Sequence, residues 1–218
     1  KNSIELKGAP VRPLRKVGFE GLRFAHNERT FMDTREPLLR SDWTIYRGGV
    51  ILLDGTEDCK ISNCIFESIG GNAIMVSNYN KSDTITGCHI FNTGANAICF
   101  IGDTKAVRSP SFRYEAYVPF NELDKQPGPK TDNYPRDCVA SDNLLHDLGE
   151  IEKQSTGVEI EIAMGIQVSN NSIYNTPRAG INIGDGCFGG HLIAFNDVFN
   201  TVRETGDHGS FNSWGRDR

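Results

Sequence analysis

Two aspartates near the C-terminal end of the sequence have the residue type and the setting that acid–base chemistry requires. Asp185 stands in Gly-Asp-Gly and Asp207 in Gly-Asp-His-Gly, and they are 22 positions apart. Flanking glycines permit unusual backbone angles and the close approach of a ligand, although either motif alone is equally typical of a simple turn. Cleavage of a glycosidic bond needs two carboxyl groups, one as proton donor and the other as nucleophile or base. We therefore predict that Asp185 and Asp207 are a catalytic pair, with a retaining or an inverting outcome left open.

Further residues suited to sugar binding accompany this pair. Histidines can orient substrate hydroxyls or tune a neighbouring carboxylate, and a tryptophan can offer its ring face to a sugar. For His191 and Trp214 a purely structural role is equally consistent with the sequence. The candidate substrate-binding residues are Glu159, Asn182, His191, His208, Trp214 and Trp43. No dense aspartate cluster recurs, so neither a metal nor another cofactor is predicted, with Ca²⁺ binding left open.

The elements that must position these groups follow from an internal repeat. Short apolar units, each preceded by a small or amide residue, recur through the chain. The distance from Cys64 to Cys88 is 24 positions, from Asn143 to Asn171 it is 28, and from Asn171 to Asn196 it is 25. A period in the twenties without helical periodicity or a leucine-rich signature is typical of a β-solenoid. We predict an all-β fold, a right-handed parallel β-helix with three short strands per coil.

Alternation along one recurring strand predicts which side chains face outwards. Ile74, Ile98, Val158 and Ile181 align at an inward position. The next, outward position holds Met75, Cys99, Glu159, Asn182 and, with one residue of slip, His208. The outer face therefore becomes polar on the last coils, and Glu161, two residues after Glu159, is interpreted as surface. By this alignment Asp207 is about one coil from Asp185 but offset sideways by roughly 10 Å, so Glu159 or Asp217 is kept as a replacement partner.

Two segments interrupt the repeat, at about residues 27–46 and 103–136. Neither has a strand or helix signature of its own, and insertions on one face of a solenoid commonly wall a binding groove. Corner asparagines, namely Asn63, Asn143, Asn171 and Asn196, are expected to adopt left-handed backbone and to form side-chain ladders. We expect residues 1–218 to be a single domain, cut from the middle of a longer chain.

Composition excludes several classes of protein. The formal charge is -5 and no block of Lys or Arg occurs, which argues against a nucleic-acid partner because phosphates require a basic surface. No stretch approaches the ~20 apolar residues of a membrane span. The six cysteines are scattered singly, so packed free thiols are expected rather than a disulfide framework or a zinc site. A neutral or weakly acidic oligosaccharide or polysaccharide is the expected partner.

Four longer motifs span both insertions and the polar end of the sequence: TFMDTREPLLRSDWTIYRGG (30–49), PGPKTDNYPRDC (127–138), PRAGINIGDGCFGGH (177–191) and ETGDHGSFNSWGRDR (204–218). They resemble the bacterial β-helix proteins of glycoside hydrolase family 141. The resemblance implies a secreted or periplasmic enzyme of plant cell-wall glycan degradation, with α-L-fucosidase or xylanase activity. It also implies a pair of catalytic aspartates, for which Asp185 and Asp207 are the best matches. Such proteins are considerably longer than 218 residues.

Two alternatives to a glycoside hydrolase stay open. A polysaccharide lyase uses the same scaffold for β-elimination, but it favours basic residues whereas the predicted groove is acidic. A non-catalytic β-helix that binds glycans is the other alternative. The sequence therefore predicts sugar chemistry at the polar end of a β-solenoid, without naming the sugar or the linkage.

Overall fold

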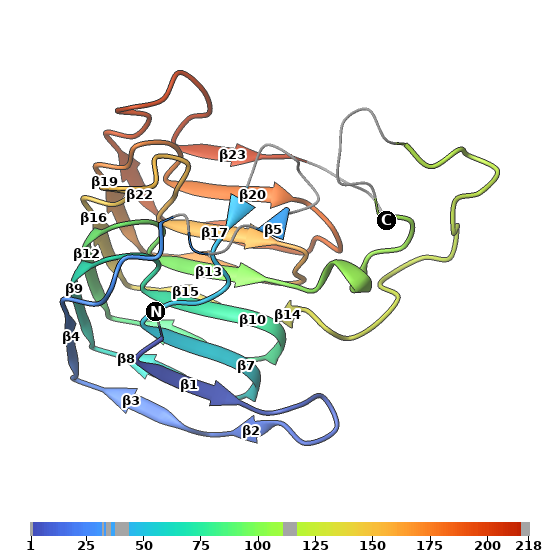
Figure 1. The fold of residues 1–218 in the computed structure, drawn as a ribbon, viewed down its shortest axis with the longest axis horizontal. Coiled ribbons are helices and arrows are strands. Elements are labelled where there is room, and N and C mark those ends of the chain that lie inside the picture. Colours follow the sequence, from blue (N-terminus) through green and yellow to red (C-terminus); the bar gives the residue numbers. More distant parts are fainter. Residues whose placement is uncertain (1, 32, 34–35, 38–43, 111–116, 215–218) are drawn as a thin grey trace.

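The chain folds into a parallel β-helix, as the repeat predicts. The computed structural model describes residues 2–31, 33, 36–37, 44–110 and 117–214. Strands from successive coils lie one above another, from β1 near one end to β23 at the other (Figure 1), and the three long sheets are built from parallel pairs. Within the described residues no helix is long and apolar enough to cross a membrane.

Each coil contributes one strand to each sheet. The first sheet consists of β1 (Ile4–Lys7), β7 (Ile51–Glu57), β10 (Ile74–Lys81), β13 (Ile98–Ile101), β17 (Val158–Glu161), β20 (Ile181–Asp185) and β23 (Phe211–Ser213), with β2 (Leu14–Arg15) beside β7 and β14 (Pro135–Arg136) beside β10. The second consists of β3 (Gly18–Glu20), β8 (Lys60–Ser62), β11 (Thr84–Thr86), β15 (Val139–Ser141), β18 (Gln167–Ser169) and β21 (Leu192–Ala194). The third consists of β4 (Arg23–Ala25), β9 (Ile65–Ile69), β12 (His89–Thr93), β16 (Leu144–His146), β19 (Ser172–Tyr174) and β22 (Asp197–Phe199).

The core fills the inside of the coils with the inward residues of all three sheets. In the first sheet Ile74, Ile98, Val158 and Ile181 pair in one register, as predicted, and all are buried. Similar apolar side chains stacked every ~4.8 Å pack closely against one another and are removed from water. All six cysteines are buried free thiols, which confirms the expectation.

Three of the four corner asparagines form the expected ladder, whereas Asn63 donates through its Nδ2 to Glu20 Oε1 at 3.3 Å. Asn143 donates through its backbone N and its Nδ2 to Asn171 Oδ1 at 3.0 and 2.9 Å, and Asn171 donates likewise to Asn196 Oδ1. The expectation of left-handed backbone is correct for Asn63, with φ of 53°. It is wrong for the three ladder asparagines, because the residue before each of them takes that conformation, namely Asp142, Asn170 and Phe195.

The two insertions contain more structure than their sequences indicate. Within the first, β5 (Glu36–Pro37) and β6 (Thr44–Ile45) form an antiparallel pair. Within the second lie β14 and a 3₁₀ turn at Thr104–Ala106. Ile45 packs onto the outer face of the first sheet against Met75 and Cys99. The expectation that these segments lack strands is therefore corrected, and the face they were expected to border is partly covered.

Candidate active site

A cluster of three carboxyl groups lies on the first sheet, formed by Glu159 and Glu161 of β17 and Asp185 of β20. We call these three residues the acid cluster. Val158 and Ile160 point into the core, so alternation places Glu159 and Glu161 together on the outer face. All three acids are fully buried. The interpretation of Glu161 as surface is therefore wrong, because side-chain alternation shows which face a residue occupies but not what covers that face.

A shift of register brings Asp185 beside Glu161. Ile160 pairs with Ile183, but the next pair is Glu161 with Asp185, so that Gly184 is skipped. A Cβ at Gly184 would lie 1.8 Å from Glu161 Oε1. The glycine therefore supplies the space that the Glu161 carboxyl group occupies, which is a packing reason for the Gly-Asp sequence.

Hydrogen bonds hold Glu159 from two sides. Asn182 Nδ2 donates to Oε1 at 2.8 Å and Thr156 Oγ1 donates to Oε2 at 3.2 Å. Thr156 is fixed in turn, because its backbone N donates to Asn96 Oδ1 at 2.7 Å. Asn96 Nδ2 donates to Asn72 Oδ1 at 2.9 Å, one coil further back. A second asparagine ladder thus runs along the corner before the first sheet and ends at Glu159.

Burial and mutual repulsion favour the protonated forms of these acids. Burial raises the pKa of Glu159 to about 8. Burial also raises the pKa of Glu161 well above its ordinary value, and the charges of Glu159 and Asp185 raise it further. Within the described residues no N–H group donates to either carboxyl oxygen of Glu161, and its side chain interacts instead with the neighbouring Glu159 carboxyl group. The acid cluster therefore carries at least one proton at neutral pH and can act as a proton donor.

The structure does not bring Asp207 to Asp185. Asp207 lies before β23 with its side chain 71% exposed, and its Oδ2 accepts from Arg178 Nη2 at 3.2 Å. Arg178, which Asp207 contacts, precedes β20, whereas Asp185 ends it. The strand that lies between them, from Ile181 to Asp185, is about 13 Å long at ~3.3 Å per residue. The sideways offset of Asp207 that the alignment indicated is present, so Asp185 and Asp207 do not form the expected pair. Glu159, a replacement partner kept open by the sequence, is in the acid cluster.

The register of the last coil explains this error. Asn182 pairs with Asn212, not with His208, because the corner before β23 is longer than the alignment allows. His208 instead accepts from Arg178 Nε at its Nδ1, at 2.6 Å. Burial has the largest effect on the Glu159 carboxyl group and raises its pKa. The guanidinium of Arg178 has the smallest of the effects and lowers the pKa. Arg178 therefore links Asp207 and His208 to the acid cluster.

The other sequence candidates are dispersed. His191 precedes β21 in the second sheet, and its Nδ1 accepts from the backbone N of Ile166 at 3.1 Å. Burial lowers the pKa of His191. Trp214 is 47% exposed, and its backbone pairs with Ile183 and Gly186 at the end of β20 that carries Asp185. Trp43 and Asp217 lie outside the described residues. The substrate-binding roles of all these residues stay predictions.

Three residues of the site escaped sequence reasoning: Glu161, Thr156 and Arg178. The alternation Glu-x-Glu in a strand, with Gly-Asp one coil later, is the signal from which Glu161 could have been found. Thr156 and Arg178 carry no such signal, because their roles depend on neighbouring coils. Across the described part of the chain no group of three His, Cys, Asp or Glu side chains is arranged to hold a metal ion.

Comparisons with known proteins agree with this fold. The family model of the right-handed β-helix region matches residues 42–199. A solved structure named "Glycoside hydrolase" superposes with a TM-score of 0.66 at 13% sequence identity, covering 97% of this chain and 39% of that chain. This chain thus spans well under half of the length of that neighbour, and at this identity the likeness shows the fold alone. No curated protein sequence matches. The narrower resemblance to family 141 stays a prediction.

Proposed function

We propose that this chain, which belongs to the right-handed β-helix family, carries the acid–base groups of a glycoside hydrolase. The proposed substrates are plant cell-wall polysaccharides with fucosidase- or xylanase-type linkages, and the proposed location is secreted or periplasmic. Support comes from the neighbouring fold named as a glycoside hydrolase, from the motifs that resemble family 141, and from the acid cluster.

The observation that carries the proposal is the burial of Glu161. One coil earlier, the position that pairs with Glu161 is Ile101, which is apolar and buried. An apolar residue would satisfy this position, whereas a buried carboxyl group without a donor costs free energy. Buried acids with strongly raised pKa values concentrate at functional sites. The acid cluster is therefore better explained by chemistry than by stability.

The environment of each acid suggests its role. Glu161, whose pKa is raised well above its ordinary value by burial and by the charges of Glu159 and Asp185, is the proposed proton donor to the departing sugar oxygen. Asp185, its partner across the coil, is the proposed nucleophile or base. Glu159, held by Thr156 and Asn182, is the third carboxyl group, and its raised pKa lets it hold a proton of the acid cluster. The Asp185 and Asp207 pair expected from the sequence is thus replaced by a pair within the acid cluster.

Substrate must reach groups that are closed to solvent in this structure. The β5–β6 pair lies over the same face of the first sheet (Figure 1), where Ile45 packs against Met75. The proposal therefore includes displacement of covering segments when substrate binds. Trp214, half-exposed next to the Asp185 end of β20, is the proposed stacking platform for a sugar ring.

The test is a screen of the chain on fucosylated and xylan-type oligosaccharides, with the product anomer followed by NMR. Glu161→Gln and Asp185→Asn preserve side-chain shape, and each is expected to lower kcat by about 10²- to 10⁴-fold. Asp207→Asn is the matched control and should stay within a few-fold of wild type. Full activity in both cluster variants, or loss only in Asp207→Asn, would overturn the assignment. Binding without turnover in the wild-type chain would favour a glycan-binding module.

One observation favours polysaccharide lyase activity as a second candidate. A lyase uses a basic group near the acidic sugar, and the guanidinium of Arg178 acts on Glu159 while its side chain is only 13% exposed. The same screen separates the two, because β-elimination gives unsaturated products that absorb in the ultraviolet and hydrolysis does not.

A further inference from the structure

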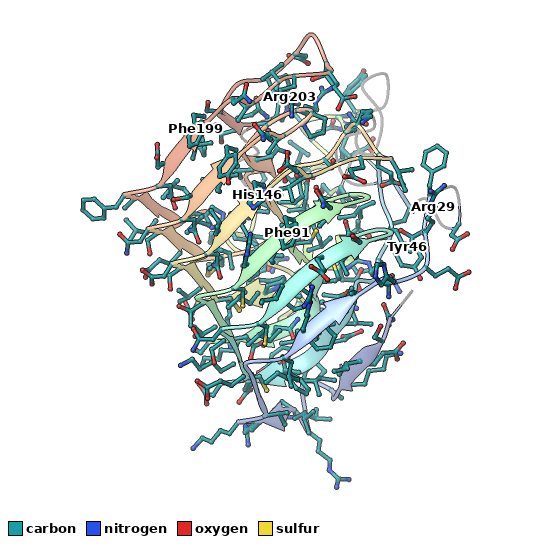
Figure 2. All side chains as sticks on the ribbon, turned by 90° about the vertical axis from the view of Figure 1, so that its left-hand side faces the viewer. Arg29, Tyr46, Phe91, His146, Phe199 and Arg203 are labelled. Carbon is teal, nitrogen blue, oxygen red and sulfur yellow. The ribbon has the colours of Figure 1, made fainter. Side chains whose placement is uncertain are left out.

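A pair of histidines on the third sheet forms a cluster that has no part in the acid chemistry. His89 of β12 and His146 of β16 lie on neighbouring parallel strands, where His146 pairs with Phe91. His89 is therefore diagonal to His146 on the same outer face. Their Nε2 atoms converge to 2.8 Å. Figure 2 shows this face, with Phe91 and His146 on adjacent strands.

The ring of His146 is held in one orientation from three directions. Its Nδ1 lies 2.7 Å from Asp147 Oδ2, and Asn175 Nδ2 fixes that carboxylate by donating to its other oxygen at 2.8 Å. Phe91 stacks on one face of the imidazole at 5.4 Å and Tyr174 on the other at 4.8 Å. An Nδ1–H bonded to Asp147 leaves the lone pair of His146 on Nε2, directed at His89.

We propose that His89 and His146 form a two-histidine binding site for a divalent transition-metal ion of the zinc, nickel or copper type. Imidazole nitrogen is a preferred ligand of these ions, whereas Mg²⁺ and Ca²⁺ prefer oxygen. A histidine whose second nitrogen donates to a carboxylate is the usual arrangement around a bound metal, because it fixes the tautomer and raises ligand basicity. Asp147 stands in this relation to His146.

The geometry needs little adjustment to accept the ion. Two ligands at Zn–N distances of ~2.0–2.1 Å in tetrahedral geometry are about 3.3 Å apart, so the two Nε2 atoms must separate by about 0.5 Å. The rings of both histidines are half-buried, with the side chain of His146 15% exposed, so water can complete the coordination. Glu67, which acts electrostatically on His89, is already paired with Arg23 at Oε1, and it is assigned no role as a ligand.

Proton balance is simple at neutral pH. Without metal, the Nε2–H of His89 donates to the Nε2 of His146. Metal binding requires both Nε2 lone pairs, so the proton of His89 moves to its Nδ1 and no net proton is released. The bound ion then bridges β12 and β16, two successive strands of the third sheet, and ties their coils together. This site is independent of the proposed glycosidase function, because the acid cluster lies on the first sheet.

The test is titration of the tag-free, chelator-treated chain with Zn²⁺, Ni²⁺ and Cu²⁺, followed by calorimetry and thermal melting. We expect one equivalent to bind and to raise Tm, with no response to Mg²⁺ or Ca²⁺. The Cu²⁺ complex should show electron paramagnetic resonance coupling to two nitrogens. His89→Ala and His146→Ala should each abolish one-equivalent binding. Asp147→Asn, which keeps both ligands, should weaken it by about 10- to 100-fold.

His26→Ala is the control, because His26 is an exposed histidine at the end of β4 and its removal should change nothing. If an alanine variant does not fold, His89→Gln and His146→Gln preserve volume and serve the same purpose. Unchanged one-equivalent binding in the His89 or His146 variants would overturn the proposal, as would the absence of a two-nitrogen signal. Loss of binding in His26→Ala would also overturn it.

Discussion

Replacing Gly184 with alanine gives a direct test of the packing of the acid cluster. The new Cβ would lie 1.8 Å from Glu161 Oε1, 2.6 Å from its Cδ and 3.1 Å from Asn182 Nδ2. Optimal contact between non-bonded heavy atoms lies near ~3.5 Å, so the carboxyl group must move by about 1.7 Å. Gly184 is not among the residues with positive φ, so the backbone itself accepts alanine. The effect of the substitution therefore reflects mainly the clash with Glu161, with a smaller contribution from the contact with Asn182.

The expected magnitude is that of overpacking a buried site, about 1–3 kcal/mol. In a domain of this size 1 kcal/mol corresponds to about 2–4 °C in Tm, so Gly184→Ala should melt at least ~2 °C and up to ~12 °C below wild type. Activity should fall more steeply, by about 10²-fold, because a shift of ~1 Å of a reacting group is costly to catalysis. Circular dichroism melts and the oligosaccharide assay measure the two effects separately.

A double-mutant cycle makes the reasoning refutable. In a Glu161→Ala background the obstructing carboxyl group is absent, and Gly184→Ala should then cost less than about 0.5 kcal/mol. Gly206→Ala is the matched control, since a Cβ there would have no neighbour within 4 Å, and its Tm should be unchanged. If the cost of Gly184→Ala is the same in both backgrounds, or is zero in the wild type, Glu161 does not occupy the space that we describe.

The pH dependence of stability should reveal the buried acid directly. The pKa of Glu159 is raised to about 8 from an unfolded value near 4.5, so the folded chain binds the additional proton between these values and its stability falls as pH rises from about 4.5 to 8; melts of Glu159→Gln should lack this contribution, and parallel curves would contradict it. The two ladders offer a second test: Asn96→Ala and Asn171→Ala should each lose about 1–3 kcal/mol through unpaired polar groups, but only Asn96→Ala, which releases Thr156, should lower activity. Equal activity of the two variants on the same oligosaccharide would show that the Asn96 ladder does not support the acid cluster. Asp207→Asn should change stability by less than about 1 kcal/mol, because its ion pair with Arg178 is exposed on the aspartate side, and a larger loss in melting would show that this contact is structural.

The sequence predicts the solenoid well because a repeated column of inward residues is a local signal. Ile74, Ile98, Val158 and Ile181 can be aligned by their spacing and their turn residues alone, and the pairing agrees. The last coil fails for a physical reason. A corner can lengthen without disturbing the strands on either side, so nothing in the strand pattern shows that Asn212, rather than His208, follows Asn182 in the sheet.

No local sequence pattern shows that the outer face of the first sheet is buried. Glu159 and Glu161 alternate with core residues in the same manner as any solvated strand, and only long-range packing makes them buried. Ile45 covers neighbouring positions from a segment more than a hundred residues earlier. The raised pKa values of the two glutamates depend on this burial, and so does our proposal of Glu161 and Asp185 as the reacting pair. Sequence reasoning therefore located the polar end of the solenoid and paired Asp185 with Asp207, an exposed residue, whereas the structure places Glu161 beside Asp185.

The second insertion connects the cover to the acids through the chain itself. It lies between β13 and β17 in the chain, so the buried apolar Cys99 and Ile101 lie on the last strand before it, and Glu159 and Glu161 lie on the next strand of the first sheet, which follows β15 and β16. Its returning end packs Tyr134 against Ile162 and Cys187, the residue after Glu161 and the second residue after Asp185. The returning end of this insertion therefore covers the ends of β17 and β20, the two strands that carry the acid cluster. Because cover and acids are joined in this way, a displacement that admits substrate would also rehydrate the acid cluster, which would lower the raised pKa of Glu161 and favour release of its proton.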